Sequence, residues 1–342
     1  MHKIILYIFL IFVVEISCRK SMPKPIPVVI KPSSVFIVNE GNFGWGNGEI
    51  SLYDPDTKTI EDNIFFRNNN YKLGDIAQSI YEYNGKYYIV VNNSGKIEVV
   101  NKTDFKHLAT ITGFKSPRFF MPVSAGRAYV TDLYDNQISV VDLTNNSIIS
   151  HIPIYGWTEE MLLYDDAVYV SNIHTDYVYK IDTKTHTLSD STKVFYGSNS
   201  LAKDKDGNIW VASLGDSLKG FKGGITCIAA NGKNILKSIP LTNAKEYISD
   251  LRINKTGDIL YYINKHIYAL PTNSLVLPTS PIFTSNGNNF YGLGVDPVSS
   301  LVYAADAKEY VTNGLIYIID PQLKTAINSF KTGIIPNGFL FK

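Results

Sequence analysis

The sequence predicts an all-β protein, a seven-bladed β-propeller closed by the C-terminal strand joining the N-terminal blade. Three observations predict this fold. The 342 residues include 23 Tyr, 17 Phe and 24 Gly but only 18% charged side chains, a composition typical of strands and tight turns. A unit of about 40 residues with four short strands recurs along the chain. The first unit lacks one strand, which the end of the chain can supply.

The clearest unit spans residues 117–156, PRFFMPVSAGRAYVTDLYDNQISVVDLTNNSIISHIPIYG. Short runs of alternating apolar and polar residues predict strands, and Asn145-Asn146 tolerates the backbone conformation of a tight hairpin. A single four-stranded sheet cannot bury both of its faces. The units are therefore expected to stack around a common axis as blades.

The number of blades follows from the end of the third strand in each unit. A carboxylate, Asn or Pro begins the turn there, and successive marks are 40 to 49 residues apart. This spacing predicts seven blades. The marks are Asp54, Asn101, Asp142, Asp182, Asn231, Pro271 and Asp320.

The two ends of the propeller predict how the ring closes. Residues 35–38 match the second strand of a blade, with no first strand ahead of them. Residues 333–341 match an inter-blade turn and a first strand, with nothing after them. We expect the C-terminal segment to pair with the first blade, which removes an open sheet edge.

The N-terminal segment predicts export. Residues 1–17 have a basic start and an apolar run that suits a signal peptide and is too short for a bilayer span. Cys18, directly after Ser17, resembles the lipidated cysteine of bacterial lipoproteins; the alternative is a cleaved secretory peptide with an incidental cysteine. Residues 18–34 are predicted to hold this cysteine and a proline-rich tether, and residues 35–342 the propeller. Cys227 is predicted to be a packed small hydrophobe.

Several of these residues carry a resemblance to known families. Pro117, Gly126, Tyr129-Val130 and Val140-Val141-Asp142 resemble the repeat of YVTN-type (YncE-like) propellers. The opening VNEGNFGWGNGEISLYDP, residues 38–55, resembles propeller lipoproteins of gut Bacteroidetes, among them surface lipoproteins that bind cobalamin and sit on a vitamin B12 transporter. The resemblance implies a lipid-anchored protein of the outer membrane, at the cell surface. It also implies cobalamin as a transported ligand rather than a cofactor, and a TonB-dependent transporter as partner.

The candidate site lies on the face where two sets of loops converge, those joining the second and third strands and those joining successive blades. These loops carry aromatic rings among amides, which suits cobalamin or a similar large flat ligand held by stacking and hydrogen bonds. The alternative is that the rings pack the loops or contact a protein. Trp45 and Trp157 are the strongest candidates because glycines flank them. The candidate ligand-binding residues are Asn39, Asn42, Phe43, Trp45, Tyr71, Asn92, Arg118, Asp132, Tyr134, Trp157, Asn172, His174, Tyr177, Tyr247, Tyr291 and Asn337.

Signals for catalysis and metal binding are weak, so no enzyme, catalytic residue or metal site is expected. The six histidines show no metal-ligand spacing. Residues 204–208, DKDGN, resemble a calcium loop, but position 213 is Ser where a glutamate is needed, which favours a hairpin turn. The phrase DGNIWVAS also resembles streptogramin-lyase-like propellers, which supplies an enzyme alternative.

The charge pattern bears on partners. The net charge is +1 and no basic stripe is present, so nucleic acid is not expected as a partner. Three functions remain open from the residues: a lipid-anchored protein that binds a small ligand, a protein-interaction scaffold of the cell envelope, and the streptogramin-lyase-like enzyme.

Overall fold

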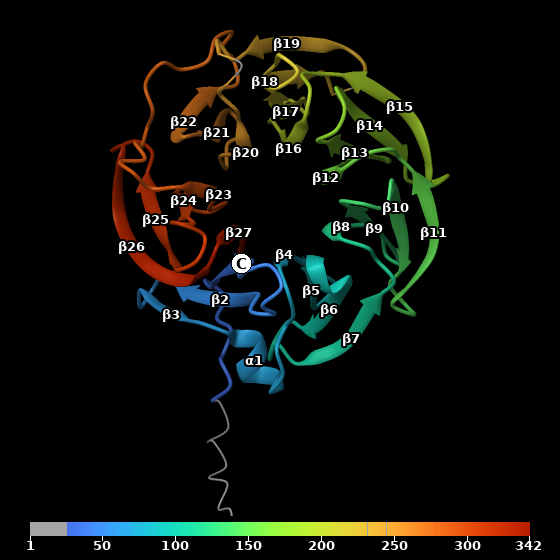
Figure 1. Ribbon diagram of the computed structural model, residues 1–342, viewed down its shortest axis with the longest axis vertical. Coiled ribbons are helices and arrows are strands. Elements are labelled where there is room, and N and C mark those ends of the chain that lie inside the picture. Colours follow the sequence, from blue (N-terminus) through green and yellow to red (C-terminus); the bar gives the residue numbers. More distant parts are fainter. Residues whose placement is uncertain (1–25, 231, 244) are drawn as a thin grey trace, which may run out of the picture.

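The computed structural model describes residues 26–230, 232–243 and 245–342, which form seven sheets around a central channel (Figure 1). The predicted all-β, seven-bladed propeller is confirmed. Each blade is an antiparallel sheet whose strands follow one another from the channel outwards. Because consecutive strands alternate in direction, the loops between second and third strands and the loops between blades lie on the same face, here called the loop face.

The blades, numbered in chain order, have the following strands from the inside outwards. Blade one consists of β27 (Pro336–Phe341), β1 (Val35–Asn39), β2 (Glu49–Asp54) and β3 (Thr59–Glu61). Blade two consists of β4 (Ala77–Tyr83), β5 (Lys86–Val91), β6 (Lys96–Asn101) and β7 (His107–Thr112). Blade three consists of β8 (Pro117–Ser124), β9 (Arg127–Asp132), β10 (Gln137–Asp142) and β11 (Ser147–Pro153). Blade four consists of β12 (Thr158–Tyr164), β13 (Ala167–Asn172), β14 (Tyr177–Asp182) and β15 (Thr187–Lys193).

The remaining blades depart from this pattern once. Blade five consists of β16 (Ser198–Lys203), β17 (Ile209–Asp216), β18 (Phe221–Ile228) and β19 (Ile235–Pro240). Blade six has three strands, β20 (Ser249–Ile253), β21 (Ile259–Asn264) and β22 (His266–Pro271), and a single bridge from Ile267 to Phe283 beyond them. Blade seven consists of β23 (Phe290–Val295), β24 (Val302–Asp306), β25 (Asn313–Asp320) and β26 (Thr325–Ile334). Outside the sheets lie α1 (Ile64–Asn69) and the short 3₁₀ helix η1 (Asn92–Ser94).

Six of the seven third strands end where the sequence pattern placed them, and β18 of blade five ends at Ile228, three residues before the predicted mark. Strands β2, β6, β10, β14, β22 and β25 end at Asp54, Asn101, Asp142, Asp182, Pro271 and Asp320. The seventh mark, Asn231, lies outside the described residues. In the turns, Asp142 accepts hydrogen bonds from the backbone N–H groups of Thr144 and Asn145, which explains why a carboxylate marks this position.

The ring closes as predicted. Strand β27 pairs antiparallel with β1, with Phe339 opposite Ile37 and Leu340 opposite Phe36. The ring of Tyr303, in blade seven, packs edge-on against Phe341 at 5.1 Å. The last strand of the chain therefore completes the first blade and also contacts the seventh.

The core lies between the blades, where aromatic and branched side chains from adjacent sheets interlock. Tyr88 in blade two stacks on Phe120 in blade three with centroids 4.3 Å apart, and both are buried. Trp210 and Cys227 are also buried, within blade five, and the desolvated thiol has its pKa raised to about 12. Cys227 is therefore a packed hydrophobe, as its apolar strand predicts.

The segment before the propeller is partly held against it. The backbone of Val28 exchanges hydrogen bonds with the amide of Asn68 in α1, and Lys31 pairs with Asp54. The end of the predicted tether, residues 26–34, thus lies along blade one and α1 (Figure 1). The predicted signal peptide, residues 1–17, and the predicted lipidation site Cys18 lie outside the described residues. In the part of the chain that the structure describes, no helix is long and apolar enough to cross a bilayer.

Candidate ligand-binding site

Each innermost strand carries a β-bulge at its second residue. In β16, Ser198 lies opposite Ser213 but Ser200 lies opposite Ala212, so Asn199 has no partner across the ladder. The same one-residue shift occurs in the other six blades. A bulge redirects a side chain and is frequent beside functional sites. The bulged residues, here called the channel ring, are Gln78, Arg118, Glu159, Asn199, Asp250, Tyr291 and Asn337.

The channel ring encloses a cavity of about 500 Å³. All seven side chains line it, and so do Trp157 and the charged side chains of Glu40, Glu160 and Arg252. The cavity therefore combines four carboxyl groups with two guanidinium groups in a low-dielectric setting, where each charge requires a partner. In the described part of the chain, no three His, Cys, Asp or Glu side chains converge as ligands for a metal ion.

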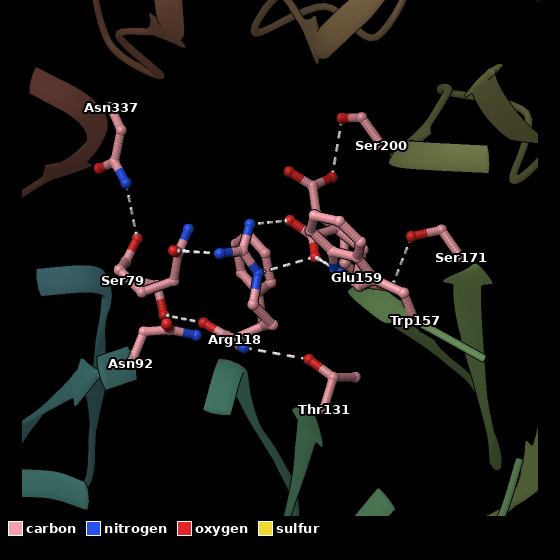
Figure 2. A network of polar contacts seen from close by, with 12 residues as sticks. Ser79, Asn92, Arg118, Thr131, Trp157, Glu159, Ser171, Ser200 and Asn337 are labelled. Atoms are coloured by element: carbon pink, nitrogen blue, oxygen red, sulfur yellow. Dashed lines mark hydrogen bonds and ion pairs between the residues drawn. The ribbon is translucent and has the colours of Figure 1, made fainter. Parts of the chain in front are cut away.

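Arg118 is the centre of the first charged cluster (Figure 2). Its Nε and Nη2 donate to the two carboxylate oxygens of Glu159 at 2.9 and 2.5 Å, and its Nη1 donates to Gln78. Trp157 Nε1 also donates to Glu159, at 2.5 Å, and its ring lies 5.4 Å from the guanidinium carbon. Burial alone would lower the pKa of Arg118, but the Glu159 carboxylate raises it above its usual value, so the guanidinium stays charged.

Arg252 holds the second charged cluster. Its Nη1 donates to Glu160 Oε1 at 2.8 Å, its Nε donates to the carbonyl of Leu293 at 3.1 Å, and it forms an ion pair with Asp250. Burial raises the pKa of Asp250 to about 7, against the opposing effect of Arg252. Asp250 also has a positive φ of 56°, a conformation uncommon outside glycine, which the hydrogen bond from Leu293 N to its Oδ2 helps to hold.

The third cluster joins the two ends of the propeller. Asn337 Nδ2 donates to Glu40 Oε1 at 2.8 Å and to the carbonyl of Gln78 at 3.2 Å. Tyr291 places its hydroxyl 3.4 Å from Glu40, and its ring packs edge-on against Tyr310. Burial raises the pKa of Glu40, and burial together with Glu40 raises the pKa of Tyr291.

The sequence-predicted site residues fall into three groups. The first group lines the cavity: Arg118, Trp157, Tyr291 and Asn337. His174 stands beside this group, since its ring packs edge-on against Trp157 at 5.9 Å. These residues come from blades one, three, four and seven, so the fold brings together positions that are far apart in sequence.

The second group lies on the loops, away from the cavity lining. Phe43, Trp45, Tyr134 and Tyr247 are exposed by 75, 74, 68 and 50%, and Tyr155, which the sequence analysis missed, by 76%. These five side chains are here called the aromatic rim. Other predicted residues take local roles: Asn42 donates to the carbonyl of Tyr310, Tyr71 packs edge-on against His107 on the outer strand of blade two, and Tyr177 packs beside Tyr179.

The third group is buried in the turns, where the side chains bond to other parts of the chain. Asp132 accepts from the backbone N–H groups of Lys115 and Ser116, Asn92 donates to the carbonyl of Pro117, and Asn172 donates to the carbonyl of Tyr155. Asn39 bonds to Ser51 and Thr332. Their polar atoms are used by the chain itself, which leaves them little capacity for a ligand. These predicted ligand contacts are Asn39, Asn92, Asp132 and Asn172.

The sequence analysis also missed cavity residues. The missed side chains sit in innermost strands or just past the end of β1, where no loop signal points to them. One sequence signal could have identified the missed residues of the channel ring, because each is the second residue of an innermost strand. Arg118 and Asn337, which the sequence analysis included, occupy this position after Pro117 and Pro336. The missed residues are Glu40, Gln78, Glu159, Glu160, Asn199, Asp250 and Arg252.

Comparison with known proteins identifies the family. A family model described as a domain of unknown function, DUF5074, matches residues 33–321. The chain therefore belongs to the DUF5074 family. No functionally curated protein matches the sequence.

Several solved structures resemble this fold at low sequence identity. A quinoprotein alcohol dehydrogenase-like protein from Bacteroides thetaiotaomicron has a TM-score of 0.70 at 14% identity, over 91% of this chain and 78% of that one. The periplasmic gluconolactonase PpgL of Pseudomonas aeruginosa has a TM-score of 0.69 at 10% identity, over 90% and 98%. A candidate 6-phosphogluconolactonase from Bacteroides fragilis has a TM-score of 0.67 at 12% identity, over 92% and 99%.

These matches correct the expectation that the chain is not an enzyme. That expectation rested on weak catalytic motifs, yet a gluconolactonase has the same fold over nearly its whole length. Weak catalytic motifs are therefore no ground for excluding an enzyme with this fold. At 10 to 14% identity the matches show the fold alone, and they assign no reaction to this chain.

Proposed function

We propose that the protein is a lipoprotein of the outer membrane, displayed at the cell surface, that binds cobalamin or a similar large flat ligand on its loop face. In this proposal the ligand lies across the aromatic rim with one group in the channel, and passes to a TonB-dependent transporter. The ligand is cargo and not a cofactor. The lipid anchor is Cys18, and the ligand assignment draws on the resemblance of residues 38–55 to cobalamin-binding propellers.

The observation that carries the proposal is the exposure of the aromatic rim. Phe43 and Trp45 stand on one loop with three quarters of their surfaces open to solvent. Large apolar side chains gathered on one face are typical of binding sites. Stacking one such ring on a ligand over about 100 Å² contributes on the order of 2.5 kcal/mol.

The rim is also connected to the cavity. The loop that carries Phe43 and Trp45 is fastened by Asn42, which donates to the carbonyl of Tyr310 at 2.8 Å. Tyr310 packs on Tyr291 of the channel ring. A ligand that stacks on the rim can therefore reach polar groups of the channel from the same loop face, which suits a molecule that is flat and also bears polar side groups.

The test is an equilibrium titration of the propeller, residues 26–342, with cyanocobalamin, followed by tryptophan fluorescence or calorimetry. We expect a dissociation constant well below micromolar. Absence of binding at 10 μM cobalamin, roughly 7 kcal/mol or less of binding free energy, would remove the ligand assignment while leaving the fold intact. Co-purification of the full chain with an outer-membrane receptor tests delivery separately.

A second candidate is a hydrolase that acts on a small cyclic ester in the channel. It is favoured by the carboxyl group of Asp250, whose pKa near 7 suits a general acid or base, and by the gluconolactonase of the same fold. Turnover of gluconolactone by the wild type, lost in Asp250→Asn, would support this candidate.

A further inference from the structure

The channel ring has hydrogen-bond acceptors left over. Among the described residues, Asn199 Oδ1 and Asn337 Oδ1 are buried and receive no hydrogen bond. Asp250 Oδ1 forms an ion pair with Arg252 but likewise receives no hydrogen bond. All three side chains line the cavity. A buried acceptor without a donor is costly, and native structures keep few of them without a functional reason.

The arginine and tryptophan donors of the cavity, by contrast, are occupied. Arg118 uses Nε, Nη1 and Nη2 on Glu159 and Gln78, and Trp157 Nε1 also donates to Glu159. Arg252 uses its guanidinium on Glu160, Asp250 and a carbonyl. The orientation of the Asn337 amide is fixed because its Nδ2 donates to Glu40 and to a carbonyl. A ligand group that only accepts hydrogen bonds would therefore find these donors already engaged.

The charged side chains of the cavity also favour a ligand group that donates hydrogen bonds or is cationic. The two guanidinium groups face four carboxyl groups, Glu40, Glu159, Glu160 and Asp250. Arg118 is matched by Glu159, and Arg252 is shared by Glu160 and Asp250, so two positive charges serve three of these carboxyls. Among the described residues Glu40 forms no ion pair, and Asp250 has only a share of Arg252. A cationic or hydrogen-bond-donating group would stabilise the ionised form of either, whereas an anion would be repelled.

We infer that the channel ring binds a neutral or cationic hydrogen-bond-donating group, a hydroxyl, primary amide or ammonium, through Asn199, Asp250 and Asn337, and rejects anionic groups. This inference deepens the proposed function, on which it rests, by stating which end of the bound ligand enters the channel. By this inference the channel differs from sites that bind phosphorylated or carboxylated substrates, because those sites need free arginine or lysine donors.

The experiment uses three probes on one sugar scaffold that fit a cavity of about 500 Å³: glucosamine, glucose and glucuronate. They place an ammonium, a hydroxyl or a carboxylate on the same ring. Ligand-observed NMR titration at pH 7.5 is expected to give the order glucosamine, glucose, glucuronate, with at least tenfold between the first and the last. Glucuronate binding as tightly as glucosamine would overturn the inference, and so would no binding of glucosamine or glucose at 10 mM.

Variants locate the binding. Asn199→Leu is expected to weaken the binding of glucosamine at least tenfold. Asp250→Asn is expected to abolish the higher affinity for glucosamine than for glucose. The matched control is Asn145→Leu, in an exposed turn at the face opposite the loop face, which should change nothing. Equal affinities in wild type and Asn199→Leu would overturn the assignment to the ring.

Parallel titration with cyanocobalamin distinguishes the two proposals. Cyanocobalamin binding together with a preference for glucuronate would remove the inference on the ring and leave the proposed function standing. If the three sugars bind with the predicted order of affinities but cyanocobalamin does not bind, the inference on the channel ring is supported and cobalamin is removed as the ligand.

Discussion

Two sets of positions repeat around this propeller, and they behave in opposite ways. At the end of the second strand, or one residue past it, a short amide or carboxylate side chain recurs in five blades and bonds to neighbouring groups of the chain: Asn39, Asn92, Asp132, Asn172 and Asp306. At the bulge of the innermost strand the seven residues include an amide, a carboxylate, a guanidinium and a phenol. Equivalent backbone positions thus carry similar side chains in the turns and different side chains in the channel.

The difference has a physical reason. A turn between blades leaves backbone N–H or C=O groups unpaired, and a short amide or carboxylate can satisfy either kind, as Asp132 and Asn92 do. The bulged side chain is redirected into the channel, and in the ring Asp250 and Asn337 are the members that bond to backbone groups, those of Leu293 and Gln78. The identity of the bulged residue is free to match its neighbours or a ligand. In a repeat protein, positions with equal geometry and unequal chemistry are therefore the first place to look for a site.

The largest expected effect comes from separating a charged pair of the ring. Arg118→Met leaves the Glu159 carboxylate buried and unpaired, which should lower the free energy of unfolding by roughly 3 to 5 kcal/mol. The double variant Arg118→Met, Glu159→Gln should recover at least half of that loss. Urea unfolding followed by circular dichroism measures both; equal stability of the single and double variants would show that the pair is not coupled.

The next effect is a fall in stability with rising pH. Burial, acting against Arg252, raises the pKa of Asp250 to about 7, and burial together with Asp62 raises the pKa of Glu49 to about 7. Because the folded state holds these protons more tightly than the unfolded state, the stabilisation is complete below about pH 4 and is lost as pH rises through 7. Each group contributes on the order of 3 kcal/mol to this change.

Two variants sharpen the pH prediction by comparing the ring with the outer sheet. Asp250→Asn, in the ring, and Glu49→Gln, in β2, should each flatten part of the decline in unfolding free energy between pH 4 and pH 8. A wild type that gains stability over this range would contradict the burial of these carboxyls.

A smaller loss is expected at a uniform turn position. Asp132→Ala leaves the backbone N–H groups of Lys115 and Ser116 without an acceptor in a buried turn, at a cost of about 2 kcal/mol. The matched ring variant, Asn199→Ala, should cost less than 1 kcal/mol because its oxygen has no donor to lose. If denaturant unfolding shows a larger loss of free energy for Asn199→Ala than for Asp132→Ala, the distinction between turn residues and channel-ring residues is refuted.

The smallest effect on stability is expected at the aromatic rim. Trp45→Ala and Phe43→Ala remove exposed rings and should change the unfolding free energy by no more than about 0.5 kcal/mol. Each should nevertheless weaken cyanocobalamin binding about tenfold. Leu323→Ala, an exposed apolar residue in the turn between β25 and β26, is the control and should leave binding unchanged.

The fold was largely predictable because the signals that define it are local. Asp142 and Asp320 mark turns within a few residues, and the pairing of β27 with β1 follows from two incomplete ends. The site was predictable only in part. Aromatic loop residues such as Trp45 stand out in sequence, whereas Asp250 and Arg252 acquire their role from a bulge and from Glu160, ninety residues earlier in the chain. The sequence alone could not show that Asn92 and Asp132 bond to backbone groups, because a polar loop residue in that role resembles one that binds a ligand.

The most direct test is a paired measurement on Asn199→Ala, in the channel ring, and Asn172→Ala, in a uniform turn, which records unfolding free energy and cyanocobalamin affinity for both. The account predicts that Asn199→Ala loses affinity about tenfold with stability changed by less than 1 kcal/mol, and that Asn172→Ala loses about 2 kcal/mol of stability with affinity unchanged. The reverse pattern would contradict it.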